Sequence, residues 1–286
     1  MIPRALPPSS RPRTRRSQTP SAPLSPRNPK VQRLRRLAHR RAARLAEGAF
    51  VIDGPTLVSE ALDAGVPLES AFAEPATIGE PHHGLLARLA DAGVPVHEVV
   101  PNSLARVTDT VTPQGVAAVA PLPAVALDEV AEADVVLVLV SVSDPGNAGT
   151  LVRTAEASGV GAVVFCRNSV DPFAPKCVRA SAGSLFHVLI ASGEDPVEVL
   201  ERLGDTHRRR IGMAAREGQR YDAVDLMGPA AIVVGSEAHG LPDEVRPLID
   251  EWVHVPMGGR VESLNVAVAG ALVLFEAARQ RERSSG

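Results

Sequence analysis

Aromatic residues are scarce in this sequence. They make up 3% of its 286 residues, with a single Trp and a single Tyr. Proteins that read RNA on an open sheet, or that hold single strands, stack the bases on rows of aromatic side chains. The composition therefore argues against nucleic-acid binding by aromatic stacking.

Cysteines and long hydrophobic runs are also scarce. The two cysteines, Cys166 and Cys177, have no Cys-x-x-Cys or paired Cys/His spacing around them, so we expect no metal site. Two cysteines in a chain of this length fit a reducing compartment. The apolar stretch over residues 133–142 is interrupted by Asp134 and Ser141, and it is much shorter than the ~20 residues of a membrane-spanning helix. No apolar run follows the N-terminal arginines, as it would in a signal peptide. We therefore expect a soluble, cytoplasmic protein without a membrane partner.

Charge is distributed unevenly along the chain, although the formal net charge is only −3. Thirteen of the 30 Arg and Lys residues lie in residues 1–50, together with a single acidic residue, Glu47. A basic N-terminal part on an acidic body predicts a polyanionic partner, which we expect to be RNA. The RNA contacts predicted in this part are Lys30, Arg33, Arg36, Arg40, Arg41 and Arg44.

The N-terminal part divides into an arm and a small domain. Residues 1–27 are rich in Pro, Ser and Arg and are expected to form a disordered basic arm. Such an arm fits RNA contact and a solvated tail equally well. Residues 28–121 begin with a basic helix over residues 30–46 and then alternate short apolar strands with helices, which indicates a small α/β domain. Prolines mark a linker over residues 121–126.

A second α/β unit is expected over residues 127–286. The runs Val135–Val140 and Ala230–Val234 are apolar throughout, as in parallel strands that are buried on both faces. Further strands are expected at residues 162–165, 186–190, 210–214 and 252–255, and helices at residues 147–158, 196–203 and 263–281. This alternation predicts a parallel sheet with helices on both faces.

The sequence has no complete Rossmann, P-loop or G-x-S-x-G motif. A different motif, Asp144-Pro-Gly-Asn-Ala-Gly-Thr-Leu-Val-Arg153, follows the first predicted strand of the second unit. Asn147 is expected to cap the next helix. Gly149 would leave the guanidinium of Arg153 a clear path to the sheet edge, where open α/β sheets bind ligands. By itself the motif is more typical of a capped helix with a surface arginine.

Two further motifs follow predicted strands. Gly235-Ser-Glu-Ala-His-Gly-Leu-Pro242 contains glycines that would let a ligand approach the backbone. The other motif runs from Val255-Pro-Met257 to Ser263-Leu-Asn265 and enters a C-terminal helix that is apolar nearly all round. Such a helix is expected to be buried against the body and a partner subunit. Either motif alone is more often structural.

Together, in this order and spacing, the three motifs resemble those of the SpoU (TrmH-type) RNA 2′-O-methyltransferases, DPxNxGxxxR, GxExxGL and IPMxGxxxSLN. The segment from Lys176 to Phe186 is similar to the family's Arg-x-Ser-x-Gly segment, and we count its Arg179 among the RNA contacts. The resemblance covers residues 130–282 well, and more weakly residues 28–120, which look like the family's small substrate-binding domain. Ser141 departs from the usual Asp, but the Asn and Arg of the motif are intact.

The resemblance implies a trefoil-knotted α/β domain that binds S-adenosylmethionine and forms a homodimer with its active site at the interface. The implied activity is methylation of a ribose 2′-hydroxyl. We favour ribosomal RNA over tRNA, because a separate N-terminal domain suits a large substrate. By position, the implied cofactor-binding residues are Gly235, Val255, Met257 and Leu264. The implied catalytic residue is Arg153, assisted by Asn147, Glu237, Ser263 and Asn265.

The chemistry fits these residues. Methyl transfer from a sulfonium requires a hydroxyl held in line with the methyl carbon. An arginine guanidinium stays protonated in proteins, so we expect Arg153 to orient a phosphate and stabilise the alkoxide rather than act as a base. His239 and His254 are candidate bases from their positions alone. Two other functions stay open: a non-catalytic RNA-binding protein with the same fold, and an α/β enzyme for a small nucleotide, which leaves the basic arm unexplained.

Overall fold

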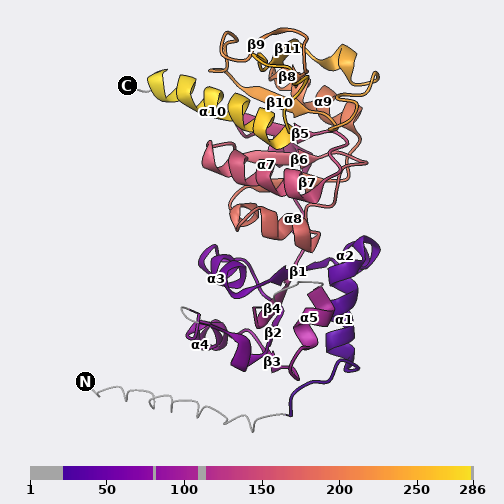
Figure 1. Cartoon of the computed structure of the whole chain (residues 1–286), viewed down its shortest axis with the longest axis vertical. Coiled ribbons are helices and arrows are strands. Elements are labelled where there is room, and N and C mark those ends of the chain that lie inside the picture. Colours follow the sequence, from indigo (N-terminus) through magenta and orange to yellow (C-terminus); the bar gives the residue numbers. More distant parts are fainter. Residues whose placement is uncertain (1–21, 80–81, 109–113, 285–286) are drawn as a thin grey trace, which may run out of the picture.

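The structure, a computed structural model, describes residues 22–79, 82–108 and 114–284 (Figure 1). Most of the arm predicted over residues 1–27 lies outside the described residues. The chain forms a small domain and a large domain, as expected, and Figure 1 shows one below the other. Within the described part of the chain, no helix is long and apolar enough to cross a membrane.

The small domain is built on a four-stranded sheet in the order β1-β4-β2-β3. Strand β4 pairs antiparallel with β1 and β2, whereas β2 and β3 are parallel. Helix α1 covers the sheet with the buried side chains of Val31, Leu34 and Leu37. Its elements are α1 (Pro29–His39), α2 (Arg41–Glu47), β1 (Ala49–Asp53), α3 (Pro55–Asp63), β2 (Ser70–Ala73), η1 (Pro75–Thr77), α4 (Leu85–Asp91), β3 (Val96–Glu98), α5 (Ser103–Thr108) and β4 (Val116–Pro121).

The single basic helix predicted over residues 30–46 is wrong: the chain forms two helices that meet at Arg40. Arg40 has an extended backbone (φ −122°, ψ 110°), which ends α1 and lets α2 start in a new direction. Leu45, which the periodicity places on the buried side, is therefore 62% exposed. Helix α5 was not predicted from the sequence.

The large domain contains a parallel sheet of seven strands in the order β7-β6-β5-β10-β8-β11-β9. This confirms the predicted α/β class. Its elements are α6 (Leu127–Val130), β5 (Val135–Leu139), α7 (Pro145–Ala157), β6 (Ala162–Phe165), α8 (Pro175–Ala180), η2 (Ser184–Phe186), β7 (Leu189–Ser192), α9 (Pro196–Asp205), β8 (Arg209–Met213), β9 (Gln219–Arg220), β10 (Ala230–Val234), η3 (Arg246–Leu248), β11 (Glu251–His254) and α10 (Val266–Ser284).

Both faces of the central strands are buried, as their unbroken apolar runs predict. Alternate residues of β5 and β10 face α7 and α10 on one side and α6 and α9 on the other. Helix α10 also packs against α7. Because all strands are parallel, the loops after β5, β8, β10 and β11 meet at one edge of the sheet.

Two predicted elements begin three residues later than expected. The strand expected at residues 186–190 begins only at Leu189, because Ser184–Phe186 forms a 3-10 turn first. The helix expected from residue 263 begins at Val266, because the side chain of Asn265 accepts hydrogen bonds from the amides of Ala267 and Val268. Asn265 thus caps α10.

Candidate active site

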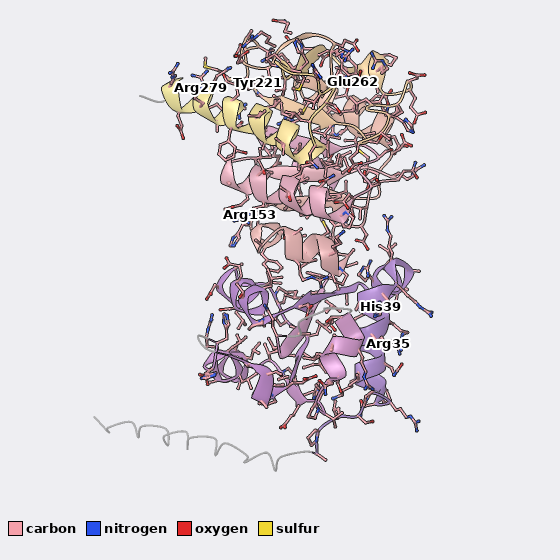
Figure 2. The ribbon with its side chains drawn as sticks, in the orientation of Figure 1. Arg35, His39, Arg153, Tyr221, Glu262 and Arg279 are labelled. Atoms are coloured by element: carbon pink, nitrogen blue, oxygen red, sulfur yellow. The ribbon has the colours of Figure 1, made fainter. Side chains whose placement is uncertain are left out.

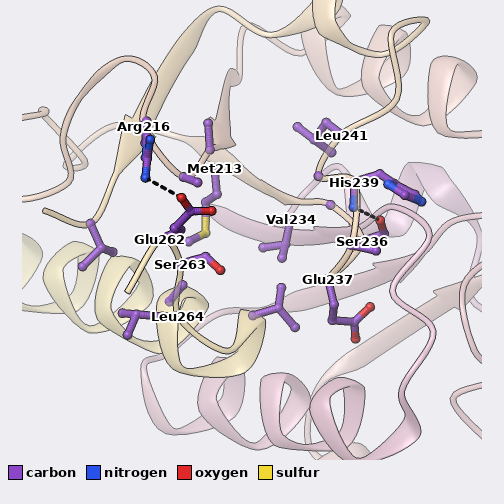
Figure 3. A pocket seen from close by; sticks show the side chains of 18 of the residues that line it. Met213, Arg216, Val234, Ser236, Glu237, His239, Leu241, Glu262, Ser263 and Leu264 are labelled. Atoms are coloured by element: carbon purple, nitrogen blue, oxygen red, sulfur yellow. Dashed lines mark hydrogen bonds and ion pairs between the residues drawn. The ribbon is translucent and has the colours of Figure 1, made fainter. Parts of the chain in front are cut away.

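A cavity of about 450 Å³ lies at the carboxyl edge of β8, β10 and β11 (Figure 3). Its walls come from residues 213–216, 234–241 and 255–269, which belong to three different strand–loop connections. The volume is within the range of ordinary small-ligand sites. All four residues implied to bind the cofactor line this cavity: Gly235, Val255, Met257 and Leu264.

Gly235 allows the loop after β10 to fold tightly beside the cavity. Ser236 and Gly240 exchange backbone hydrogen bonds of 2.9 and 3.0 Å, which brings the Gly240–Leu241 peptide over Gly235. A Cβ atom at Gly235 would come within 2.5 Å of the Leu241 nitrogen and closer still to the Gly240 carbonyl. The Val255, Met257 and Leu264 side chains supply an apolar wall. A backbone cradle with an apolar wall fits a nucleoside-containing ligand such as S-adenosylmethionine.

Three of the predicted catalytic residues form one hydrogen-bonded chain. The Asn147 side-chain amide donates to Glu237 (3.1 Å), and its carbonyl accepts from the Asn265 amide (2.9 Å). Glu237 also accepts from the backbone N–H groups of Ser143 and Asp144, each at 3.4 Å. These hydrogen bonds therefore connect the segments that follow β5, β10 and β11 beside the cavity.

This network sets the ionisation of Glu237. Partial burial acts to raise the pKa of the Glu237 carboxyl, but the hydrogen bonds from Asn147, Ser143 and Asp144 outweigh it, so the pKa lies below its ordinary value. Glu237 is thus an ionised carboxylate that anchors the neighbouring loops. A carboxylate with a lowered pKa is a weak base.

The prediction that Asn147 caps the helix is wrong. Helix α7 begins at Pro145, and its cap is Asp144, whose side chain accepts a 2.8 Å hydrogen bond from the Asn147 backbone. Proline suits the first helical position because it has no N–H to satisfy. This earlier start leaves the Asn147 side chain free to bridge Glu237 and Asn265.

Arg153 is exposed on α7 and does not line the cavity of its own chain. In Figure 2 it lies beside α7 and α8, well apart from Glu262 at the cavity. The role predicted for Gly149 is also wrong. A Cβ atom at Gly149 would lie 2.5 Å from the Ala180 Cβ and 2.6 Å from the Cys177 carbonyl, so the glycine is needed to pack α7 on α8.

Only some of the other polar residues predicted for the site lie at the cavity. Ser263 and His239 line it, whereas His254 does not. Sequence reasoning missed Arg216, which pairs with Glu262 at 3.3 Å at one end of the cavity (Figure 3). Arg216 directly follows the strand predicted at residues 210–214, so the sheet-edge rule applied to that strand would have indicated it.

The predicted RNA contacts are not equivalent in the structure. Arg40 and Arg41 are exposed, and within the described residues their side chains have no hydrogen bond or ion pair. Others are engaged: Arg33 with Glu47 and Glu69, Arg36 with Glu47, Lys30 with His97, and Arg179 with Asp53. The contact predicted for Arg44 is wrong, because this residue is 4% exposed and pairs with Asp171 at 2.6 Å.

Comparisons with known proteins agree with this geometry. Residues 134–275 match the SpoU rRNA Methylase family, and residues 28–118 match the MRM3-like substrate binding domain. The chain is 32% identical over 238 residues to the 23S rRNA (guanosine(2553)-2′-O)-methyltransferase RlmP of Bacillus subtilis. The aligned region covers 83% of this chain and 91% of the relative.

Solved structures are similar over nearly the whole chain. The SpoU methyltransferase AviRb from Streptomyces viridochromogenes, in complex with AdoMet, has a TM-score of 0.80 and 27% identity, over 90% of this chain and 99% of its own. An AdoMet-bound rRNA methyltransferase from Sinorhizobium meliloti has a TM-score of 0.76 and 28% identity, over 88% and 95%.

Proposed function

The chain belongs to the SpoU rRNA methylase family, and we propose that it transfers the methyl group of S-adenosylmethionine to a ribose 2′-hydroxyl of ribosomal RNA. One observation carries the proposal. The cavity at the sheet edge meets the Glu237–Asn147–Asn265 chain, so a ligand site and a polar site adjoin.

The cofactor fits the cavity through the residues described above. When bound, S-adenosylmethionine supplies an electrophilic methyl group on a sulfonium. Gly235 lets the Gly240–Leu241 peptide fold closely over it and so shapes one wall, and Val255, Met257 and Leu264 form an apolar wall. Glu237 and Asn265 hold Asn147 at the site, and Ser263 at the cavity wall presents a hydroxyl that could orient the ribose.

We propose that Arg153 acts on the active site of a second copy of the chain. Its own cavity does not contain it, and α10, which packs on α7, has an exposed apolar face with Val268 and Phe275 each 51% exposed. Apolar faces of this kind are typical of subunit interfaces. A homodimer formed through α10 would bring the partner subunit's Arg153 towards the cavity, where its guanidinium would hold the target phosphate and stabilise the alkoxide. The trefoil knot implied by the family belongs to the same proposal.

Ribosomal RNA is preferred over tRNA because a relative that is 32% identical, RlmP of Bacillus subtilis, is a 23S rRNA methyltransferase. The test combines purified protein, methyl-labelled cofactor, and ribosomal RNA or tRNA from a strain that lacks the gene. We expect the label on one ribose of ribosomal RNA, whose 3′ phosphodiester bond becomes resistant to alkaline cleavage. Label in tRNA only would move the target. Binding of both cofactor and RNA without any label would favour the non-catalytic alternative.

A further inference from the structure

The two domains are joined by a buried ion pair. The Arg44 guanidinium donates two hydrogen bonds to one Asp171 oxygen, at 2.6 and 2.8 Å, and a third to the Leu37 carbonyl at the end of α1, at 2.7 Å. Both side chains are largely buried, at 5% and 13% exposed. Beside them the Phe50 and Phe173 rings pack with their centroids 5.0 Å apart. Arg44 therefore connects the end of α1, in the small domain, to the start of the 171–187 segment in the large domain.

The 171–187 segment makes further contacts with the small domain. Arg179 on α8 pairs with Asp53 at 3.2 Å, and His187 contacts Glu60 at 2.8 Å. The backbone at Gly183 lies so close to Glu60 that a Cβ atom there would be 2.6 Å from the Glu60 Cγ. These contacts tie the segment to the small domain before α8, at the end of α8 and after it.

The same segment also packs tightly against α7, the helix that carries Asn147. Helix α8 lies directly against Gly149 of α7, and Lys176 pairs with the cap residue Asp144 at 3.6 Å. The first turn of α7 carries Asn147, which is hydrogen-bonded to Glu237 and Asn265. A shift of the small domain would therefore move Asn147 through α8.

We propose that the 171–187 segment fixes the position of the small domain relative to the active site, and that the Arg44–Asp171 ion pair anchors it. The segment would thereby determine which nucleotide is methylated. The inference rests on the proposed function. Arg44 and Asp171 are positioning residues, because they act on the reaction through α8 and α7. A buried, hydrogen-bonded ion pair suits this task because it accepts one geometry and few others.

The test replaces the pair without leaving a buried charge. In the double variant Arg44→Met/Asp171→Asn, Met keeps the apolar stem, and Asn keeps the acceptor for the Phe173 N–H, which is bonded at 2.9 Å in the wild type. We expect unchanged cofactor affinity and RNA affinity. We expect kcat to fall by up to about a hundredfold with little change in KM, because small misplacements cost that much. Some methyl groups should also appear on neighbouring nucleotides.

A matched control removes the exposed Arg202–Asp128 pair with the same substitutions, and it should behave like the wild type. Hydrogen exchange gives a readout that needs no RNA: amides in the first turns of α7 should exchange faster in the double variant only. Unchanged exchange, or wild-type kcat at a single ribose, would overturn the proposal. If the wild-type protein methylated no RNA at all, the proposed function would fail, while the exchange result would still decide whether the domains are coupled.

Discussion

At the scale of single residues, the site depends on one asparagine. Asn147 is at once a donor to Glu237 and an acceptor for Asn265, and it lies in the first turn of α7, whereas Glu237 and Asn265 follow β10 and β11. No other residue in the described part of the chain connects these three segments. The lowered pKa of Glu237 is a consequence, since the Asn147 amide favours the ionised carboxylate.

Asn147→Ala should reduce methyl transfer and destabilise the fold by about 1 kcal/mol near neutral pH, which is typical of a lost hydrogen bond. A carboxyl group whose pKa is lower in the folded than in the unfolded protein stabilises the fold at pH values above the unfolded pKa, and this stabilisation is lost as the pH falls through the folded pKa. The difference in free energy of unfolding between Asn147→Ala and the wild type should therefore shrink in acid. Urea unfolding across the pH range below about 5 measures it.

Thr154→Ala is the control for Asn147→Ala, because its hydroxyl bonds only to the Thr150 carbonyl within α7. It should leave turnover and the pH dependence unchanged. A stability difference for Asn147→Ala that stays constant down to the acid limit would show that Glu237 is not coupled to Asn147.

At the scale of elements, helix packing and helix direction decide what the motifs do. Gly149 sits where α7 crosses α8, and the bend at Arg40 separates α1 from α2. The first feature sets how closely two helices approach. The second sets which arginines face solvent and which turn inward.

Gly149→Ala should destabilise the protein by about 1–3 kcal/mol, because the added methyl group has no space between α7 and α8. It should also lower turnover, since α7 carries Asn147. Gly84→Ala is the matched control, as nothing lies within 4 Å of its Cβ position and its φ is −79°. Thermal unfolding of both variants compares them, and equal midpoints would show that α7 and α8 can separate freely.

The α1–α2 bend should carry RNA contacts through its unpaired arginines. Arg40→Ala/Arg41→Ala should weaken RNA binding and reduce the slope of log K against log salt by roughly two, one per lost phosphate contact. Arg33→Ala/Arg36→Ala should change the slope less, because those guanidinium groups already pair with Glu47 and Glu69. A salt titration of RNA binding tests both, and equal slopes for the two variants would argue against the bend as a contact.

At the scale of the whole molecule, the position of Arg153 is the main observation. The residue lies outside the cavity of its own chain, on a helix that packs beside an exposed apolar face. In a monomer of this geometry, the cofactor cavity and the arginine proposed to be catalytic do not meet. Assembly of two copies would resolve this.

Arg153→Ala and Gly235→Val should each abolish methyl transfer when tested alone. Only Gly235→Val should abolish cofactor binding, because its side chain would collide with the Gly240–Leu241 peptide and displace the loop that lines the cavity. When the two proteins are mixed and allowed to exchange subunits, about a quarter of the wild-type activity should return, because half of the dimers pair one intact cavity with one intact arginine. Scintillation counting of labelled RNA measures it. No recovery in a mixture shown to contain heterodimers would place Arg153 in the active site of its own chain.

The sequence by itself determined most of the strands, the ligand edge and much of the lining of the cavity. Strands β5 and β10 are unbroken apolar runs, which only a doubly covered parallel strand requires, and Ala230–Val234 was predicted to the residue. Gly235, Val255, Met257 and Leu264 were implied by the resemblance of the three motifs to the SpoU family, and all four line the cavity. The strand signals are local, since each depends on residues within one strand and the loop after it.

Only the tertiary structure decided what the charged and small residues do. Arg44 looks like a surface cation in a basic helix, but its partner Asp171 lies 127 residues away and turns it inward. Gly149 is needed because of Cys177 and Ala180, and Arg153 is exposed on α7 outside the cavity of its own chain. The direction and partners of such side chains depend on how distant elements cross, and no local pattern in the sequence carries that information.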